Sequence, residues 1–529
     1  MHDRVEPPPA MAPDVARADE IAQWLRGRMP ANGALRLDSR EVVPGDAFFA
    51  LPGARSDGRR FVDDAVARGA AALLVDGPAD GAPSGSDVVP ALPVPCRAVP
   101  GLRMLAGRIA SRFHDAPSEA LRVVAVTGTN GKTSTTQWIA EGMHRPDAPS
   151  AVVGTLGSGV VGHRGAAGLT TPDALSFQAM LADYRARGVD VVAAEASSIG
   201  LDQGRLEGTA LEVAVFTNLT RDHLDYHGTM DVYGAAKARL FGWPDLHAVV
   251  VNGDDPFAPT LLQAARAGRG DGGAPDSIVY GVMPGRYGAR GDRALLAERI
   301  IEDGSGVLLA LGGDFGSADV RLSLVGRFNA SNAMAVAGTW LALGVPFDQV
   351  AEKLEALRPV PGRMQTIERD GAPLVVIDYA HSPDALSNVL ASLRVSCNSR
   401  GGALWCVFGA GGDRDPGKRP IMGMVAERAA DRLVVTSDNP RSEEPFRIVS
   451  DIRAGLTREP AITELDRARA IERAIGEAAP ADVVLIAGKG HETYQEIAGV
   501  RHPFSDADVA RRALDARAPD PCSKETERV

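Results

Sequence analysis

A strand, a glycine-rich turn and the start of a helix follow one another at Val123–Ser134, which reads Val-Val-Ala-Val-Thr-Gly-Thr-Asn-Gly-Lys-Thr-Ser. The apolar residues predict a short buried parallel strand, and a helical pattern begins around Thr133. Backbone N–H groups of such a turn and the positive end of the helix dipole form a cradle for phosphate. Lys132 is therefore the predicted phosphate lysine, and Thr133 the hydroxyl that holds Mg²⁺. The stretch departs from the G-x-x-x-x-G-K-[ST] pattern at Val126, and an ordinary βα turn is the alternative.

Composition limits the class of protein. The chain has 529 residues, 45% of them hydrophobic and 24% charged, which is typical of several globular domains. The net charge is −11 without a basic block, so nucleic acid is not an expected partner. The four cysteines lack metal-ligand spacing, which is typical of a reducing compartment. The first residues lack the apolar core of a signal peptide and no long apolar run follows, so we expect a cytoplasmic protein with no membrane partner.

Three α/β domains are predicted along the chain. Residues 1–15 are rich in proline and are expected to form a disordered tail. Residues 16–117, with a helix over Ala18–Arg28, suggest a small mixed α/β N-terminal domain. Residues 118–357 alternate apolar strand runs with helical stretches, which predicts a central, doubly wound P-loop ATPase domain. Residues 358–529 alternate in the same way and predict a Rossmann-like C-terminal domain.

Polar residues end two predicted strands that follow the phosphate loop. Glu195 closes an apolar run, and a buried carboxylate is unfavourable without a partner. It is either a ligand of a Mg²⁺ that bridges the phosphates or one half of a structural salt bridge. Asp222 and His223 follow the next strand, and His223 is either a second metal contact or a surface histidine. For His227 a ligand and a turn residue fit equally, and Lys237, alone on a helix, is by itself expected to be a solvated charge.

The C-terminal region offers polar loops at the ends of its predicted strands. In an open α/β sheet, ligands bind beyond the carboxyl ends of the strands. That rule selects four loops: Asp378–His381, Gly409–Arg414, Asp438–Arg441 and Gly488–Glu492. A nucleotide switch needs a single P-loop domain and none of these loops. Ligation fits better, because ATP can activate a carboxylate as an acyl phosphate that an amine attacks, while domain closure excludes water.

Six motifs, taken in order, resemble those of the Mur ligase family of peptidoglycan synthesis. They are Thr127–Thr133, Glu195-Ala-Ser-Ser198, Thr217–Asp225, Asn329-Ala-Ser-Asn332, Asp378-Tyr-Ala-His381 and Asp438-Asn-Pro-Arg441. The resemblance covers nearly the whole chain apart from the tails and some loops. Within the family, the chain is most similar to ligases that add 2,6-diaminopimelate to a UDP-linked muramoyl dipeptide.

This resemblance implies an ATP-dependent amide ligase that works through an acyl phosphate. The implied substrates are UDP-MurNAc-L-Ala-D-Glu, meso-diaminopimelate and ATP, and the expected state is a monomer. The N-terminal domain would bind the UDP part, with Leu37 and Ser39 at the uridine and the loop Gly53–Gly58 beside it. The residues implied for the muramoyl dipeptide are Thr170, Thr171, Ser197, Gln203 and Arg205. Arg205 suits a carboxylate or phosphate because its guanidinium is forked.

The resemblance also implies a site for ATP and Mg²⁺. The residues implied for ATP are Gly128, Thr129, Asn130, Gly131, Lys132, Thr133, Ser134, Asn329, Arg363 and Asp378. Lys237 matches the lysine that the family carbamylates, which reverses its reading as a solvated charge. The carbamate would join Thr133, Glu195 and His223 in holding metal, so that Lys132, Lys237, His223 and Glu195 are the expected catalytic residues.

The Asp438–Arg441 motif indicates which amino acid is added. Diaminopimelate differs from lysine by a second, distal carboxylate, and a guanidinium can bind it through two parallel hydrogen bonds. Arg441 supplies that group, whereas the lysine-adding relatives lack this arginine. The residues implied for the diaminopimelate site are Arg414, Asp438, Asn439, Pro440, Arg441, Gly488 and Glu492. Glu492 is expected to receive the distal ammonium, and the alternative for Arg441 is a surface salt bridge.

The chain departs from the family pattern at three positions. Leu169, Ile199 and Ser382 stand where asparagine, histidine and threonine are common. None of them touches the phosphate loop, so activity is still expected. Two other readings are a ligase similar to folylpolyglutamate synthetase, which lacks the N-terminal motif and Arg441, and a regulator that binds a nucleotide without catalysis.

Overall fold

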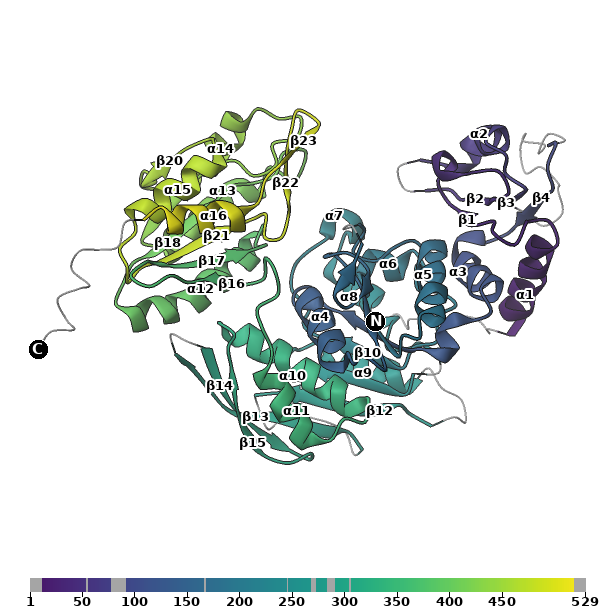
Figure 1. Cartoon of the computed structure of the whole chain (residues 1–529), viewed down its shortest axis with the longest axis horizontal. Coiled ribbons are helices and arrows are strands. Elements are labelled where there is room, and N and C mark those ends of the chain that lie inside the picture. Colours follow the sequence, from purple (N-terminus) through teal and green to yellow (C-terminus); the bar gives the residue numbers. More distant parts are fainter. Residues whose placement is uncertain are drawn as a thin grey trace, which may run out of the picture. The chain divides into compact units, whose positions relative to one another are not determined.

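The computed structural model describes residues 12–53, 56–77, 92–165, 168–244, 246–267, 273–282, 291–303 and 306–517 (Figure 1). The chain divides into two compact units. The first comprises Met1–Tyr280, Gly285–Ala294 and Gly338–Gly344, and the second comprises Gly281–Pro284, Leu295–Ala337 and Val345–Val529. The part of the expected disordered tail before Ala12, and two residues of the loop Gly53–Gly58, lie outside the described residues.

The N-terminal part is a four-stranded parallel sheet with helices. Its order is β1-β2-β3-β4, and its elements are α1 (Ala12–Arg26), β1 (Leu35–Arg36), β2 (Ala47–Ala50), α2 (Val62–Ala67), β3 (Ala72–Asp76), β4 (Cys96–Val99) and α3 (Leu102–Phe113). Phe49 and Leu74 of the sheet, Leu25 of α1 and Ile109 of α3 share one core. Helix α1 begins at Ala12, within the residues predicted to form the tail, so the expected tail is shorter than predicted.

The sheet of the central part carries the phosphate loop. Its strands in this unit lie in the order β12-β11-β10-β5-β9-β6-β7-β8. The strands are β5 (Arg122–Thr127), β6 (Ser150–Val153), β7 (Gly159–Val160), β8 (His163–Arg164), β9 (Val191–Glu195), β10 (Val213–Phe216), β11 (Ala248–Asn252) and β12 (Asp276–Gly281). The helices are α4 (Lys132–Met143), α5 (Ala174–Ala186), α6 (Ser198–Asp202), α7 (Leu224–His227), α8 (Met230–Ala238) and α9 (Ala258–Ala267). Strands β9 and β10 flank β5 and run parallel to it, so the three carboxyl ends share one edge of the sheet.

The second unit begins with antiparallel strands that the sequence did not predict. They are β13 (Arg293–Asp303), β14 (Gly306–Gly313) and β15 (Ala318–Leu322), and β14 pairs antiparallel with both neighbours. The helices that follow are α10 (Arg327–Ala342) and α11 (Phe347–Glu355). Helix α10 matches the predicted helix that continues past Trp340, and its last residues, from Gly338, belong to the first unit.

The C-terminal sheet has helices on both faces. Its order is β16-β17-β21-β18-β19-β20, and a separate hairpin consists of β22 and β23. The strands are β16 (Gln365–Ile367), β17 (Leu374–Asp378), β18 (Leu404–Phe408), β19 (Arg432–Val435), β20 (Ile462–Thr463), β21 (Val483–Ala487), β22 (Tyr494–Ile497) and β23 (Val500–Pro503). The helices are α12 (Pro383–Arg400), α13 (Lys418–Ala429), α14 (Pro445–Arg453), α15 (Arg467–Glu477) and α16 (Asp506–Asp515). Val376 belongs to one core and its neighbours Val375 and Ile377 to another, as expected for a strand buried on both faces.

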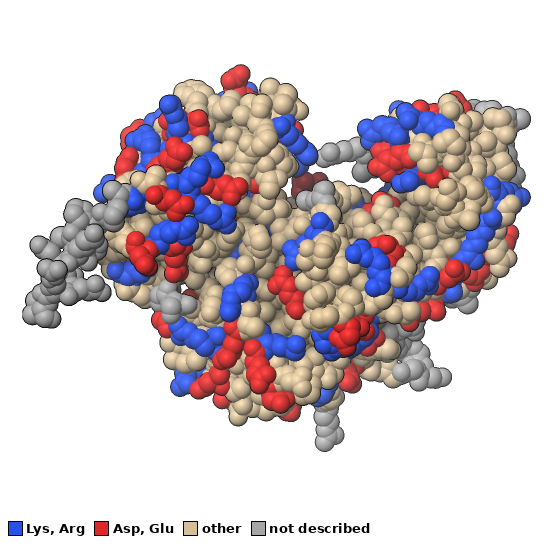
Figure 2. Space-filling model, in the orientation of Figure 1, with Lys and Arg blue, Asp and Glu red and all other residues tan. Residues whose placement is uncertain are grey.

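The α/β fold class with three domains is confirmed, and the antiparallel strands β13–β15 are an addition to it. Among the described residues, no helix is both long and apolar enough to cross a membrane. On the face that Figure 2 shows, acidic and basic side chains are interspersed among uncharged ones.

Candidate active site

The phosphate loop has a backbone that requires glycine. Strand β5 ends at Thr127 and helix α4 begins at Lys132, and the loop between them contains Gly128 with φ +150° and Gly131 with φ +86°. A Cβ atom at Gly128 would overlap the hydroxyl of Thr217 and crowd the backbone of Asn218. The loop therefore has the close packing and left-handed backbone expected of a phosphate cradle at a helix N-terminus.

Residues that follow β10 hold the loop in place. Asn218 accepts hydrogen bonds from the backbone N–H of Thr129 at its carbonyl, 2.8 Å, and from that of Asn130 at Oδ1, 2.9 Å. The hydroxyls of Thr129 and Tyr233 lie 3.0 Å apart. The loop is thus fixed before any ligand binds. Ser134, in the first turn of α4, is buried.

Two lysines converge on one carbonyl oxygen of this loop. Lys132 Nζ and Lys237 Nζ donate to Gly128 O over 2.9 and 2.8 Å. Lys237 is 1% exposed, so its reading as a solvated charge is wrong. Burial, and then the positive charge of Lys132, hold the pKa of Lys237 well below its usual range, although Asp222 acts in the opposite direction. A buried amine without its proton is a nucleophile.

Glu195 is a buried carboxylate beside the phosphate loop. It is 1% exposed and accepts from Thr133 Oγ1 over 3.0 Å and from the backbone N–H of Thr155 over 2.8 Å. The structure favours a metal-ligand role over a salt bridge, because the side-chain and backbone donors to this carboxylate among the described residues are uncharged threonine groups. Gly154 follows directly after β6, and a Cβ atom there would overlap the Glu195 carboxylate. The glycine therefore leaves the space that the carboxylate occupies. Carboxylate and hydroxyl oxygens are the donors that Mg²⁺ prefers.

The two histidines after β10 differ in their surroundings. His223 has φ +52° and its Nε2 lies 3.6 Å from Asp222 Oδ2, while burial lowers its pKa. His227 is buried, and its Nε2 lies 3.0 Å from Ser198 Oγ, which favours a turn-stabilising role. Within the described ranges, no three side chains of His, Cys, Asp or Glu are arranged to hold a metal. A Mg²⁺ site here would need hydroxyl or carbamate oxygens besides Glu195.

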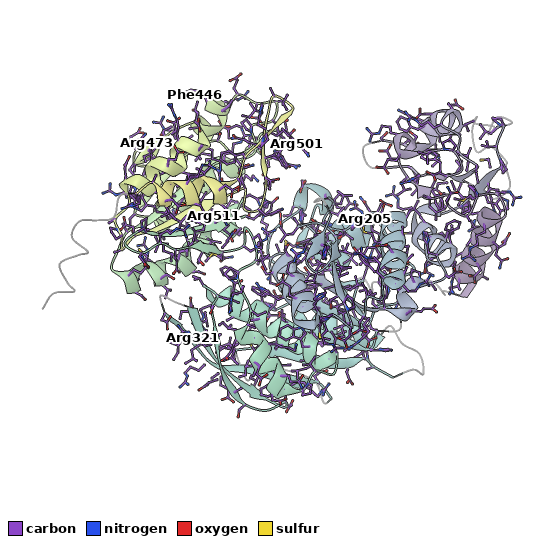
Figure 3. All side chains as sticks on the ribbon, viewed as in Figure 1. Arg205, Arg321, Phe446, Arg473, Arg501 and Arg511 are labelled. Carbon is purple, nitrogen blue, oxygen red and sulfur yellow. The ribbon has the colours of Figure 1, made fainter. Side chains whose placement is uncertain are left out.

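The residues expected at the muramoyl dipeptide form one hydrogen-bonded group beside Glu195. Thr171 Oγ1 donates to the carbonyl of Glu195 and accepts from Ser197 N, over 2.7 and 3.0 Å. Arg205, which Figure 3 labels, donates to Gln203 Oε1 through both Nε and Nη2, and from Nη1 to Thr171 O over 2.6 Å. The neighbouring Thr170 hydroxyl lies 3.1 Å from that of Thr155, whereas Leu169 is exposed. In the N-terminal part, Leu37 packs on the core and Ser39 is buried.

Three residues expected at ATP belong to the second unit. Asp378 is buried at the end of β17, where its carboxylate accepts from the backbone N–H groups of Met364 and Ala380, each over 2.8 Å. The guanidinium of Arg363 stacks 4.5 Å from the centre of the Tyr379 ring. The amide of Asn329 donates to Val325 O within the turn before α10.

The loops expected at diaminopimelate come together at the ends of β19 and β21. A Cβ at Gly488, φ +115°, would strike Asp438 Oδ2, so the two loops touch. Arg441 has φ +53°, and its Nη1 donates to Gly412 O over 2.6 Å. Arg441 and Arg414 are both neighbours of Gly411, and Pro440 is buried. The surface salt bridge considered for Arg441 is not observed among the described acidic groups.

Buried charges that the sequence reading missed support these loops. Lys489 is fully buried and pairs with Glu492 over 2.8 Å. Arg467 and Asp506, both fully buried, form an ion pair, and Arg467 also donates to Ser437 O and Ala487 O at the ends of β19 and β21. Arg467 follows the helix cap Asp466 in the sequence, and no local pattern marks it as buried.

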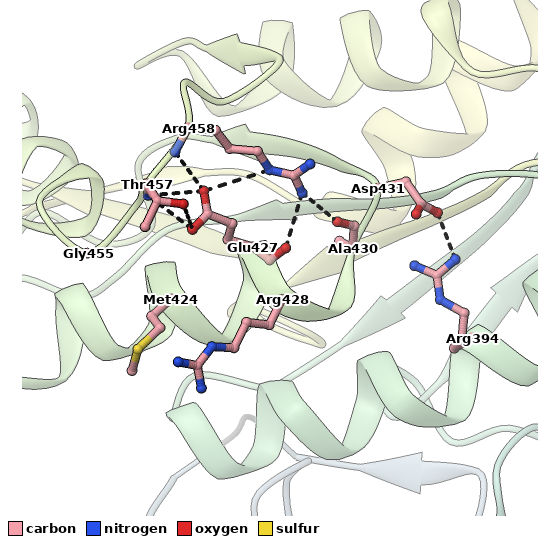
Figure 4. Close-up of a pocket in the computed structure, with 9 residues that line it drawn as sticks. All are labelled: Arg394, Met424, Glu427, Arg428, Ala430, Asp431, Gly455, Thr457 and Arg458. Atoms are coloured by element: carbon pink, nitrogen blue, oxygen red, sulfur yellow. Dashed lines mark hydrogen bonds and ion pairs between the residues drawn. The ribbon is translucent and has the colours of Figure 1, made fainter.

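A surface pocket lies apart from these loops. Most of its charged groups pair with one another, since Glu427 accepts from Thr457 and Arg458, and Asp431 accepts from Arg394 (Figure 4). Ser382, one of the departures from the family pattern, caps α12 through its hydroxyl and so does the work of a threonine there.

The first α/β sheet carries a phosphate loop whose backbone requires glycine, and the C-terminal sheet carries charged loops at the ends of its strands. Together these features define a multidomain nucleotide-binding protein. Residues 34–114 match the family description "Mur ligase family, catalytic domain", residues 126–340 the "Mur ligase middle domain", and residues 362–490 the "Mur ligase, glutamate ligase domain". The chain belongs to the Mur ligase family.

Named relatives and solved structures agree with this assignment. A protein of Ralstonia nicotianae named UDP-N-acetylmuramoyl-L-alanyl-D-glutamate–2,6-diaminopimelate ligase is 46% identical over 516 residues, which cover 96% of this chain and 98% of that protein. A protein of Xylella fastidiosa with the same name is 47% identical, covering 96% and 97%. A solved structure of a ligase of that name superposes with a TM-score of 0.64 at 36% identity, covering 91% and 94%. A folylpolyglutamate synthase of Mycobacterium tuberculosis, at 20% identity and a TM-score of 0.57, shares the fold.

Proposed function

We propose that this chain is an ATP-dependent ligase that joins meso-2,6-diaminopimelate to UDP-N-acetylmuramoyl-L-alanyl-D-glutamate in peptidoglycan precursor synthesis. The similarity to ligases of that name over almost the entire chain supports this function. The observation that carries it is the loop at the end of β19, where Arg441 is held by Gly412 O next to the buried pair of Lys489 and Glu492. These groups suit an amino acid that has a distal carboxylate and a distal ammonium.

In the first half-reaction, the D-glutamyl γ-carboxylate attacks the γ-phosphorus of ATP and ADP leaves. The backbone N–H groups of Thr129–Thr133 and the ammonium of Lys132 bind the phosphates and stabilise the charge that develops on them. Lys132 now donates to the loop carbonyls of Gly128 and Thr129, and we infer that it turns to the phosphates when ATP binds. Asn329, Arg363 and Asp378 would complete the nucleotide site from the second unit.

The Mg²⁺ site would consist of Thr133, Glu195, His223 and a carbamate on Lys237. Bound Mg²⁺ supplies positive charge that offsets the charge of the phosphates. The oxygens of Thr133 and Glu195 fit this hard cation. Lys237 fits carbamate formation because the enclosed Nζ can add to CO₂ and release one proton, which converts an amine into a pair of carboxylate-like oxygens. The Lys237 amine donates a hydrogen bond to Gly128 O, whereas a carbamate oxygen would be repelled by that carbonyl. The carbamate would therefore need a metal ion beside it.

In the second half-reaction, the amine of diaminopimelate attacks the acyl carbon and phosphate leaves, so that an amide forms. Arg441 binds the distal carboxylate and Glu492 the distal ammonium, with Arg414, Asp438 and Gly488 around them. The hydrogen-bonded group of Thr171, Ser197, Gln203 and Arg205 is proposed to hold the muramoyl dipeptide, with Thr170 beside it, and Leu37 and Ser39 to hold the uridine.

We further propose domain limits at residues 16–117, 118–357 and 358–529, with the N-terminal domain binding the UDP part. We also propose that the reaction takes place in the cytoplasm, in keeping with its nucleotide substrates. We propose a monomer, because each substrate would have its own domain within one chain.

The test is phosphate release from ATP with each substrate omitted in turn. Release that requires both the UDP-muramoyl dipeptide and meso-diaminopimelate supports the proposal. Equal turnover with L-lysine would refute the specificity for diaminopimelate. Turnover with a pteroyl substrate and glutamate would support a folylpolyglutamate synthetase, and nucleotide binding without turnover would support a regulator.

A further inference from the structure

The side chain of Asn439, in the Asp438–Arg441 loop, is turned into the protein. It is 3% exposed, and its Oδ1 accepts from Lys489 Nζ and from the backbone N–H of Glu496, each over 2.9 Å. Its Nδ2 donates to Glu492 Oε2 over 2.8 Å. Both lone pairs of the amide oxygen are therefore used within the protein. Asn439 therefore joins three segments of the chain: its own loop, the loop after β21 and the hairpin of β22 and β23.

Lys489 is the charge at the centre of this network. Its ammonium is fully buried and donates to Asn439 Oδ1 and to Glu492 Oε2, over 2.9 and 2.8 Å. A buried ammonium is unfavourable unless it is paired in this way. Both donors to Glu492 meet at Oε2, and no hydrogen bond of the described residues reaches Oε1. The network thus holds one carboxylate oxygen and leaves the other for a ligand.

The hairpin of β22 and β23 fixes the backbone of Arg441. The N–H of Arg441 donates to Glu496 O over 3.0 Å, and its carbonyl accepts from Ala498 N over 2.7 Å. Gln495 Nε2 donates to Asp438 O over 2.7 Å. Arg441 has a left-handed backbone, which a residue with a Cβ adopts only when its surroundings impose it. The same hairpin that receives Asn439 therefore also sets the direction of Arg441.

We propose that Lys489 is a positioning residue for the amino-acid substrate. It holds Glu492 directly and, through Asn439, the loop that carries Arg441. The distal ammonium and the distal carboxylate of diaminopimelate are bonded to one carbon, so the two groups that bind them must keep a fixed separation. Lys489 sets that separation and thereby contributes to the choice of diaminopimelate over lysine. This inference rests on the proposed function.

The test compares Lys489→Met with Arg473→Met, which removes a positive charge from a half-exposed site in the same domain (Figure 3). We expect Lys489→Met to raise the KM for meso-diaminopimelate at least tenfold and to reduce the preference over lysine, with KM values for ATP and the UDP-dipeptide within about twofold of wild type. Arg473→Met should change none of them. If Lys489→Met does not fold, Asn439→Asp replaces it, because this change keeps the volume but places a carboxylate against Glu492 Oε2.

A double-mutant cycle with Glu492→Gln tests whether Lys489 acts through Glu492. We expect the double variant to lose less than the sum of the two single losses for diaminopimelate, because both changes remove the bond between Lys489 and Glu492 while the bond from Lys489 to Asn439 is lost only once. Additive effects would overturn the positioning role, as would equal changes in all three KM values together with a lower Tm. If the wild-type protein shows no turnover that depends on diaminopimelate, the proposed function fails. Normal wild-type turnover with an unaffected Lys489→Met variant refutes this inference alone.

Discussion

Replacing Arg441 by alanine should separate the recognition of diaminopimelate from the other functions of the site. The Arg441 guanidinium donates to Gly412 O through Nη1, and we expect its Nε and Nη2 groups to bind the carboxylate. Hydrogen bonds to a charged group contribute about 1.5–3 kcal/mol, and removing such a contact lowers kcat/KM by roughly 10- to 150-fold. Arg441→Ala should therefore lower kcat/KM for diaminopimelate by that factor and leave the KM for ATP unchanged.

Steady-state phosphate release measures these constants, and thermal unfolding controls for stability. Among the described residues, the Arg441 side chain donates only to Gly412 O, so the free energy of unfolding should fall by no more than about 1.5 kcal/mol. Arg441→Lys keeps a positive charge but not the forked geometry, and it should restore part of the loss. Arg473→Ala is the matched control on the surface. An unchanged KM for diaminopimelate in folded Arg441→Ala would refute the assigned role.

Four further results are expected. Lys237→Ala should abolish turnover, and short carboxylates such as acetate should restore part of it; full activity without addition would exclude a carbamate. Gly128→Ala should destroy ATP binding, measured by calorimetry, because its Cβ would overlap Thr217, and normal binding would contradict the proposed cradle. Arg467→Met should lower the free energy of unfolding, measured by urea titration, by about 3–5 kcal/mol, because it leaves the Asp506 carboxylate buried without its partner. A smaller loss in the double variant Arg467→Met/Asp506→Leu would confirm that cause. Chelation with EDTA should stop phosphate release and excess Mg²⁺ should restore it, whereas turnover at full rate in EDTA would rule out the metal site.

Short apolar runs predicted the buried parallel strands well. The predicted strands Leu374–Asp378 and Val483–Ala487 are β17 and β21 with the same bounds. Strands that are covered on both faces need apolar residues at every position, so the signal is local and strong. The phosphate loop is equally local, because its glycines and Lys132 lie within a few residues of one another.

The antiparallel strand β13 could not be read in the same way. Its sequence, Arg-Ala-Leu-Leu-Ala-Glu-Arg-Ile-Ile-Glu-Asp, contains apolar pairs instead of strict alternation. The pairing with β14 shifts register between Ala297 and Arg299, which moves later side chains to the other face. The hairpin strand β23 is exposed along its length, so no apolar pattern marks it. Both elements depend on pairing partners that sequence periodicity does not reveal.

The position of Lys237 on its helix indicates burial, although a lone lysine is interpreted as a solvated charge. On α8, Tyr233, Ala236 and Lys237 are buried while Val232 is half exposed. Positions i, i+3 and i+4 share one face of a helix, so a lysine in line with a buried tyrosine and alanine belongs to the inner face. A lysine on that face needs a partner, and the partner here is Gly128 O, which is 109 residues away in sequence. Only the fold could supply it.

The motif Asp438-Asn-Pro-Arg441 shows where inference from residue types ends. The position of this loop at a strand end makes it a candidate ligand loop, and the family resemblance assigns its four residues to the amino-acid site. Asn439 and Arg441 are two positions apart, yet the Asn439 amide bonds within the protein to Lys489, Glu492 and the backbone of Glu496, whereas the Arg441 guanidinium donates to Gly412 O. What separates them is the left-handed turn at Arg441 and the hairpin beside it, both of which arise from tertiary structure. In the proposed function, Asn439 therefore shapes the amino-acid site and Arg441 binds the substrate, so a mutation at either position should raise the KM for diaminopimelate for different physical reasons.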